Sequence, residues 1–180
     1  MNDRTGFLKE VKRLRLRNIN NLLILEICFN NIFIRTNYYT SMELTSILLN
    51  EYASVETNLE NKYIQVTWLT QPKSEAFRET HKKALQNALQ HELIVWLCDM
   101  REMLYLEVAD QNWLVREIFT SFDPSFNHGV AFVVSTAGLE LMTSLRILEM
   151  VKNSPELHKQ LKVEIFFQKS IAQQWLFEAK

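Results

Sequence analysis

Leu93-Ile94-Val95-Trp96-Leu97-Cys98-Asp99 is the stretch of this sequence that decides the fold. Six apolar side chains follow one another and a carboxylate ends the run, which is too short for a helix of normal length. Such a run is typical of a strand that is buried on both faces. Because helices must then cover the sheet on either side, and amphipathic stretches flank the run in the sequence, it predicts a layered α/β domain.

The overall composition fits one globular domain plus an extension. The 180 residues are 47% hydrophobic and carry a formal net charge of −1. This balance offers no basic face that could neutralise phosphates, so nucleic-acid binding is not expected. The two cysteines, Cys28 and Cys98, are too few for a disulfide framework and favour a reducing cytoplasm.

The composition changes at Met42. Residues 1–41 carry seven Lys/Arg and three Asp/Glu, whereas residues 42–180 carry thirteen and eighteen. The first segment also holds seven of the fourteen asparagines and no alanine, glutamine, histidine or tryptophan. We therefore expect residues 42–180 to form a single domain. Residues 1–41 are expected to be an extension, either disordered or a misassigned start with translation beginning at Met42.

Two functional alternatives for the extension stay open. It can add a helix or strand to the domain, or it can be a membrane signal, since a basic run over residues 9–17 precedes a mostly apolar run over residues 22–34. Glu26, Asn30 and Asn31 interrupt that apolar run, which is shorter than the roughly 20 residues that span a bilayer. Stable membrane insertion is therefore not expected.

Hydrophobic periodicity places the other elements around the central strand. The fold class that it predicts is α/β, with a single mixed sheet and about four helices. An antiparallel hairpin begins the sheet, and right-handed, parallel β-α-β units continue it. The expected strands cover residues 52–57, 63–68, 93–99, 130–134 and 162–167, and the expected helices cover residues 72–91, 111–122, about 136–151 and 170 onwards.

Several side chains are assigned places on these helices. The buried stripe of the first helix is expected to be Phe77, Ala84, Leu85, Ala88 and Leu89, with His81 and His91 at the surface. Ser, Asp and Thr side chains accept hydrogen bonds from the free N–H groups that begin a helix. The expected caps are Ser74, Asp110, Ser135 or Thr136, and Ser170 in a capping box with Gln173.

Short segments of the predicted elements carry a family resemblance. They are Val66-Thr67-Trp68, Ser74-Glu75-Ala76-Phe77-Arg78, Trp96-Leu97-Cys98-Asp99 followed by Arg101, and Asp110-Gln111-Asn112-Trp113-Leu114. On these segments, residues from about Tyr52 to Phe177 resemble the STAS domain, named for sulfate transporters and anti-sigma-factor antagonists. The likeness is to its compact SpoIIAA-like form, found in short stand-alone bacterial proteins.

The resemblance implies a binding protein and not an enzyme. In regulatory members of the family, a phosphorylated serine or threonine after the central strand controls docking onto a kinase-like anti-sigma factor. Residues 100–110 contain neither serine nor threonine, so this switch is not carried over. Asp110 lies near that place and either caps a helix or imitates a fixed negative charge.

No complete motif for catalysis, metal binding or cofactor binding is present. His91-Glu92 begins like a zinc-peptidase helix, but Val95 stands where the second histidine is needed. The three glycines, Gly6, Gly129 and Gly138, cannot form a phosphate-binding loop. Neither an enzymatic activity nor a cofactor is therefore expected.

The candidate surface lies where the predicted strands end. Asp99 and Arg101 follow the central strand, where open α/β sheets place their ligand crevices, and they either anchor the loop as an ion pair or bind a ligand. Trp96, Trp113 and Trp175 are expected in the core, and Trp68 can belong to either class. The candidate partner or ligand surface comprises Trp68, Asp99, Arg101, Asp110 and Ser135.

Two main hypotheses of function follow. The first is a non-enzymatic STAS-like module that binds another bacterial protein, with a homodimer left open. The alternative is a carrier or sensor that holds a small apolar molecule near Trp68 and Asp99, and a remote third is an enzyme using Asp99 and Arg101. An aromatic-lined pocket of several hundred Å³ favours a carrier, whereas an exposed apolar patch favours docking.

Overall fold

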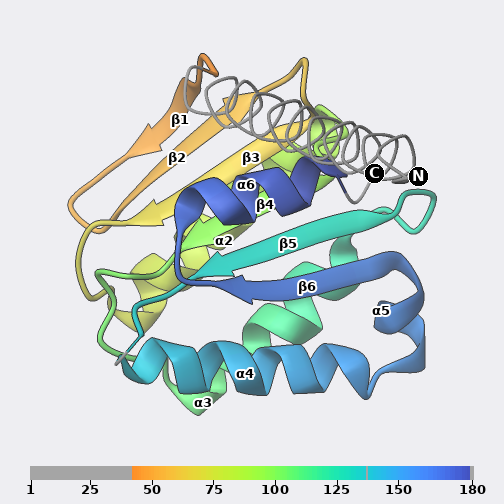
Figure 1. Ribbon diagram of the computed structural model, residues 1–180. Coiled ribbons are helices and arrows are strands. Elements are labelled where there is room, and N and C mark those ends of the chain that lie inside the picture. Colours follow the sequence, from red (N-terminus) through yellow and green to blue (C-terminus); the bar gives the residue numbers. More distant parts are fainter. Residues whose placement is uncertain (1–41, 137, 179–180) are drawn as a thin grey trace, which may run out of the picture. The chain divides into compact units, whose positions relative to one another are not determined.

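The computed structural model describes residues 42–136 and 138–178 (Figure 1). The expectations for residues 1–41 lie outside this part. The chain from Met42 onwards forms one compact unit. Its fold is α/β, with one mixed sheet of six strands and, in the described part, five α-helices.

The elements follow one another in nearly the predicted order. The strands are β1 (Thr45–Leu49), β2 (Ala53–Asn58), β3 (Tyr63–Trp68), β4 (Val95–Asp99), β5 (His128–Val133) and β6 (Leu161–Phe166). The helices are α2 (Ser74–Gln90), α3 (Val108–Trp113), α4 (Leu139–Lys152), α5 (Pro155–Gln160) and α6 (Lys169–Glu178). After α3 the chain continues as a π-helical turn, Leu114–Ile118, and a 3-10 turn, Phe119–Ser121.

The strands stand in the sheet in the same order as in the sequence, from β1 to β6. The pairs β1–β2 and β2–β3 are antiparallel, and the three pairs from β3 to β6 are parallel. The predicted mixed sheet is therefore confirmed. Strand β4 lies between two parallel neighbours and all five of its side chains are buried, as the apolar run predicts.

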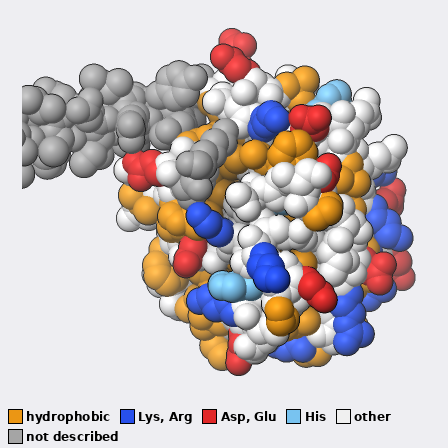
Figure 2. Space-filling view, turned by 90° about the vertical axis from the view of Figure 1, so that its right-hand side faces the viewer, with side chains coloured by type: hydrophobic (Ala, Val, Ile, Leu, Met, Phe, Trp, Pro, Cys, Tyr) orange, Lys and Arg blue, Asp and Glu red, His pale blue; other side chains and the backbone are white. Residues whose placement is uncertain are grey.

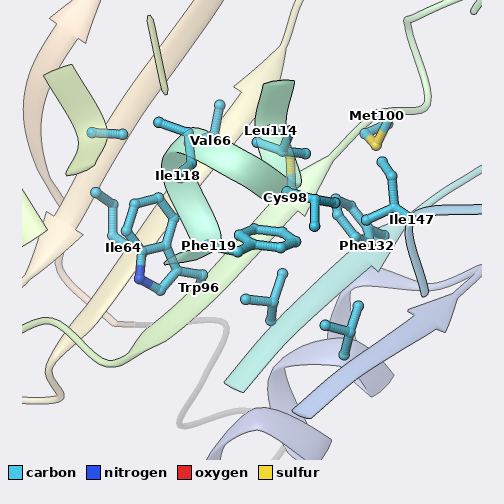
Figure 3. Packing of buried hydrophobic residues seen from close by; sticks show 14 of the residues in the cluster. Ile64, Val66, Trp96, Cys98, Met100, Leu114, Ile118, Phe119, Phe132 and Ile147 are labelled. Atoms are coloured by element: carbon cyan, nitrogen blue, oxygen red, sulfur yellow. The ribbon is translucent and has the colours of Figure 1, made fainter. Parts of the chain in front are cut away.

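Two cores cover the two faces of the sheet. Trp96 and Cys98 of β4 point into the main core, against α2, α3 with its π-helical extension, and α4. Figure 3 shows Leu114 and Ile118 of that extension, and Phe119 of the 3-10 turn, packed among the side chains of the strands. Val95 and Leu97 point the other way, into a smaller core closed by α6. Alternate side chains of β4 thus belong to two different cores, the main core on one face of the sheet and the smaller core under α6 on the other.

Strand β1 and helix α5 are absent from the prediction. Strand β1 has no alternating pattern, lies at the edge of the sheet, and contains a bulge between Ser46 and Leu48. Helix α5 follows the predicted break at residues 153–155. Pro155 occupies its first turn, and the Ser154 hydroxyl accepts a hydrogen bond from the Leu157 N–H.

The buried stripe of α2 is rotated from its predicted position. Its buried residues are Phe77, Thr80, His81, Ala84 and Ala88. The predictions for Leu89, which is 47% exposed, and for His81, which is buried, are therefore wrong. The two alanines let the helix axis approach the sheet closely, so the longer Leu85 and Leu89 side chains lie at the margin of the core.

Two of the expected helix caps are also wrong. Ser74 is the first residue of α2 and Lys73 is its N-cap, without a side-chain hydrogen bond. Ser170 lies inside the first turn of α6, which begins at Lys169. The capping box with Gln173 therefore does not form; instead the Gln173 amide lies 3.5 Å from the Tyr63 hydroxyl.

Candidate functional site

Exposed apolar side chains concentrate at the carboxyl edge, the side of the sheet where β3 to β6 end. Elsewhere in the described part, the large apolar side chains that are exposed are more scattered. A concentration of this kind is unusual on a surface that faces only water. At the carboxyl edge they are Leu69 after β3, Leu104 and Tyr105 after β4, Val108 at the start of α3, Leu139 and Met142 in the first turn of α4, and Phe167 after β6.

Hydrogen bonds hold α3 and α4 side by side at this edge. The Arg146 guanidinium of α4 donates to the side-chain oxygens of Gln111, at 3.0 Å, and Asn112, at 2.8 Å. Val108 lies three residues before Gln111, and Met142 lies four residues before Arg146. Since the two helices start from the ends of parallel strands, Val108 and Met142 lie at a similar height above the carboxyl edge of the sheet. We call Leu104, Tyr105, Val108, Leu139 and Met142 the apolar rim.

A groove of about 390 Å³ lies beside the apolar rim, between the first turns of α2 and α3. The Gln71 side chain fixes one of its walls, since the carbonyl oxygen accepts from the N–H groups of Leu104, at 2.8 Å, and Tyr105, at 3.2 Å. Its amide nitrogen donates to the Tyr105 carbonyl at 3.1 Å. The loop that carries Leu104 and Tyr105 is therefore tied to the segment after β3. The lining includes Pro72, Lys73, Ser74, Glu75, Tyr105 and Glu107.

Asp110 does not cap α3. The helix begins at Val108 with Glu107 as its N-cap, so Asp110 lies inside the first turn and is 2% exposed. One carboxylate oxygen of Asp110 accepts hydrogen bonds from Ser74 Oγ and Arg78 Nε, both at 2.7 Å. The side chain therefore joins α3 to α2 at the base of the groove.

Replacing Ser74 by alanine is expected to lower the free energy of unfolding by about 1.5 kcal/mol, because a hydrogen bond to a charged, buried carboxylate is lost. Ser170→Ala is the matched control, with an expected change below about 0.5 kcal/mol at this helix position. Urea denaturation of both variants measures the difference. Equal effects would contradict the assigned role of Ser74.

Asp99 and Arg101 form a two-pronged ion pair. The carboxylate oxygens of Asp99 lie 2.8 Å from Arg101 Nε and 2.7 Å from Arg101 Nη2. Asp99 is buried and Arg101 is exposed. The hydrogen bond with Asp99 raises the pKa of Arg101 further, so the guanidinium stays charged. This geometry fits the loop-anchoring interpretation, since both oxygens of Asp99 are engaged.

A polar cluster between the sheet and α6 was missed by the sequence analysis. Gln65 of β3 is only 2% exposed. Its amide nitrogen lies 2.9 Å from the Thr67 hydroxyl and 3.3 Å from a Glu56 carboxylate oxygen. Its carbonyl oxygen accepts a hydrogen bond from the Tyr63 hydroxyl at 3.0 Å. Burial lowers the pKa of Lys169 at the start of α6, while the charges of Asp99 and Glu56 oppose this shift. Burial also raises the pKa of Tyr63. Alternation in β3 signals a polar face, but it does not reveal that a helix covers it.

Trp68 and Asp99 lie on opposite faces of the sheet. Trp68 is buried in the main core and stacks on Phe77, with ring centroids 5.3 Å apart. Asp99 pairs in register with Thr67, the neighbour of Trp68, so the two side chains point to opposite faces of the sheet. The two side chains therefore cannot line one pocket together.

Ser135 does not cap the next helix either. Helix α4 has Gly138 as its N-cap, and the buried Glu140 carboxylate of its first turn reaches back to Ser135. Both the backbone N–H, at 2.9 Å, and the hydroxyl of Ser135 donate to Glu140 Oε1. The five candidate residues are thus divided among the core, the α6 face, the α2–α3 junction and the start of α4.

Two features that often serve in catalysis, a reactive thiol and a metal site, are not found among the described residues. Cys98 lies within β4, where burial raises the pKa of its thiol to about 12, so it is not a ready nucleophile. Among residues 42–136 and 138–178, no group of three or more His, Cys, Asp or Glu side chains could hold a metal ion. Within the same ranges, no helix is long and apolar enough to cross a membrane.

Comparison with known proteins adds no relative. No protein-family model matches the chain, and neither a curated protein nor a solved structure is significantly similar to it. The function must therefore be inferred from the residues and their arrangement.

Proposed function

We propose that this chain is a non-enzymatic, STAS-like module that binds a partner protein through its carboxyl edge. The observation that carries the proposal is the apolar rim, whose members Leu104, Leu139 and Met142 are at least 65% exposed. Large apolar side chains in such positions contribute most when a partner removes them from water. The segments that resemble the STAS domain lie on β3, α2, β4 and α3, whose ends surround the rim.

The arrangement favours docking over carriage of a small apolar molecule. The groove beside the rim is open to solvent and lined largely by polar and charged side chains, including Lys73, Glu75 and Glu107. Small apolar ligands are usually held in concave sites that are mostly apolar. A protein surface with a central apolar area and a charged margin matches the groove and rim better.

The test compares two double variants. Leu104→Asp with Met142→Asp places charges in the rim, at positions too exposed to disturb the core. Leu59→Asp with Leu89→Asp makes the same change at exposed positions near the other edge of the sheet. A partner is first captured with the tagged chain from its host and then purified, so that its affinity is measured by calorimetry.

We expect the rim variant to bind the purified partner at least about 100-fold more weakly, since a central hot-spot residue contributes about 2 kcal/mol or more and two are changed. The matched control should bind like the unmodified chain. Equal affinity of the rim variant and the control would refute docking at the carboxyl edge.

A further inference from the structure

A small cavity lies at the amino end of the main core, between the end of α2, the start of β4 and the segment before β5. It has a volume of about 20 Å³ and is lined by Leu85, Leu89, Trp96, Phe122 and His128, among others. A cavity needs about 10–15 Å³ of such space to hold a water molecule. The enclosed part therefore holds one group of the size of a hydroxyl.

Two of the lining residues each carry a buried polar atom that has no hydrogen-bond partner among the described residues. These atoms are Trp96 Nε1 and His128 Nδ1, and both residues are only 5% exposed. Their rings pack on the same Phe122 ring, with centroid distances of 5.0 Å and 4.7 Å. In Figure 3 the Trp96 nitrogen lies on the side of the ring away from Cys98, toward the amino end of β4, where this cavity is.

The two atoms have opposite hydrogen-bonding character. Trp96 Nε1–H can only donate. His128 Nε2 lies 2.9 Å from the Asp123 carbonyl oxygen, which only accepts, so Nε2 carries the proton and Nδ1 of the neutral ring is an acceptor. Burial lowers the pKa of His128, which favours this neutral form. A hydroxyl group both donates and accepts, so it complements the pair, whereas a carbonyl could serve only Trp96.

We propose that this cavity is a binding site for a small alcohol or phenol, with the hydroxyl group among Trp96, Phe122 and His128. The apolar remainder of the ligand lies along Leu85, Leu89 and Phe126, which are half-buried or exposed at the margin. The amino edge seen in Figure 2 shows hydrophobic side chains among charged ones of both signs. The site is independent of the docking proposed for the carboxyl edge.

The experiment titrates the full-length chain, labelled with ¹⁵N, with phenol and with benzene. The indole resonance of Trp96 is assigned as the one that disappears in Trp96→Phe. We expect phenol to shift it in a saturable way, and benzene to bind about tenfold more weakly because it lacks the hydrogen bonds. The indole resonances of Trp113 and Trp175, which lie on other elements, serve as internal controls.

A second variant keeps the test independent of changes inside the core. Leu89→Phe narrows the margin of the cavity at an exposed position and should weaken phenol binding about tenfold or more, the effect of roughly 1.4 kcal/mol of steric conflict. The proposal is overturned if phenol leaves the Trp96 resonance unmoved, which means that only water enters. It is equally overturned if benzene binds as well as phenol, or if Leu89→Phe binds phenol unchanged.

Discussion

Ala84→Glu is expected to lower the free energy of unfolding by about 4 kcal/mol or more, which removes most of the stability of an ordinary domain. Ala84 is fully buried where α2 meets the sheet. A longer side chain there forces the helix away from β3, and its carboxylate enters an apolar core without a cation to pair with. Urea denaturation followed by circular dichroism measures the loss.

Leu89→Glu is the matched control for this prediction. It introduces the same side chain five residues later in α2, at a position that is 47% exposed. We expect a change within about 0.5 kcal/mol, as for most surface substitutions. A comparable loss in both variants would show that the buried stripe of α2 is not the one described above.

Lowering the pH from 7 to 5 is expected to remove about 2 kcal/mol of stability through His81. Burial lowers the pKa of His81 from 6.5 to about 4, despite a hydrogen bond of 3.0 Å between Nδ1 and the Phe77 carbonyl. Between these values the unfolded chain binds a proton that the folded chain does not. The stability is therefore fully present above pH 6.5 and is lost as the pH falls toward 4.

His81→Gln removes this titration while keeping a side-chain donor for the Phe77 carbonyl. We expect the variant to lose clearly less stability than the unmodified chain between pH 7 and pH 5. A smaller decline should remain, because burial also lowers the pKa of His128. An equal slope for His81→Gln and the unmodified chain would contradict the role of His81.

The central strand was predictable because its signal is local. An unbroken apolar run that ends at Asp99 leaves few alternatives to a strand covered on both faces. The alternation in β2 and β3 likewise identified the antiparallel hairpin. Strand β1 could not be found in this way, since its five residues are mostly exposed and its conformation depends on pairing with β2.

The candidate site was less predictable because long-range contacts decide it. Ser74 and Asp110 are residue types that usually cap helices, but they bond to each other from different helices. Gln65 and Thr67 belong to the polar face of an alternating strand, and only the position of α6 determines that Gln65 is buried. Asp99 with Arg101 was found because both members of the pair lie two positions apart in the sequence.

The order of the strands has a consequence for how the chain is made. Because each strand pairs with the one that precedes it in the sequence, every newly synthesised segment leaves the ribosome next to a finished template. From β3 to β6, however, a connection that contains a helix must be made before the next strand, so the growing edge of the sheet stays unpaired during that interval. Helix α6 follows all six strands in the sequence. Until it is synthesised, Val95 and Leu97 remain uncovered on one face of the sheet.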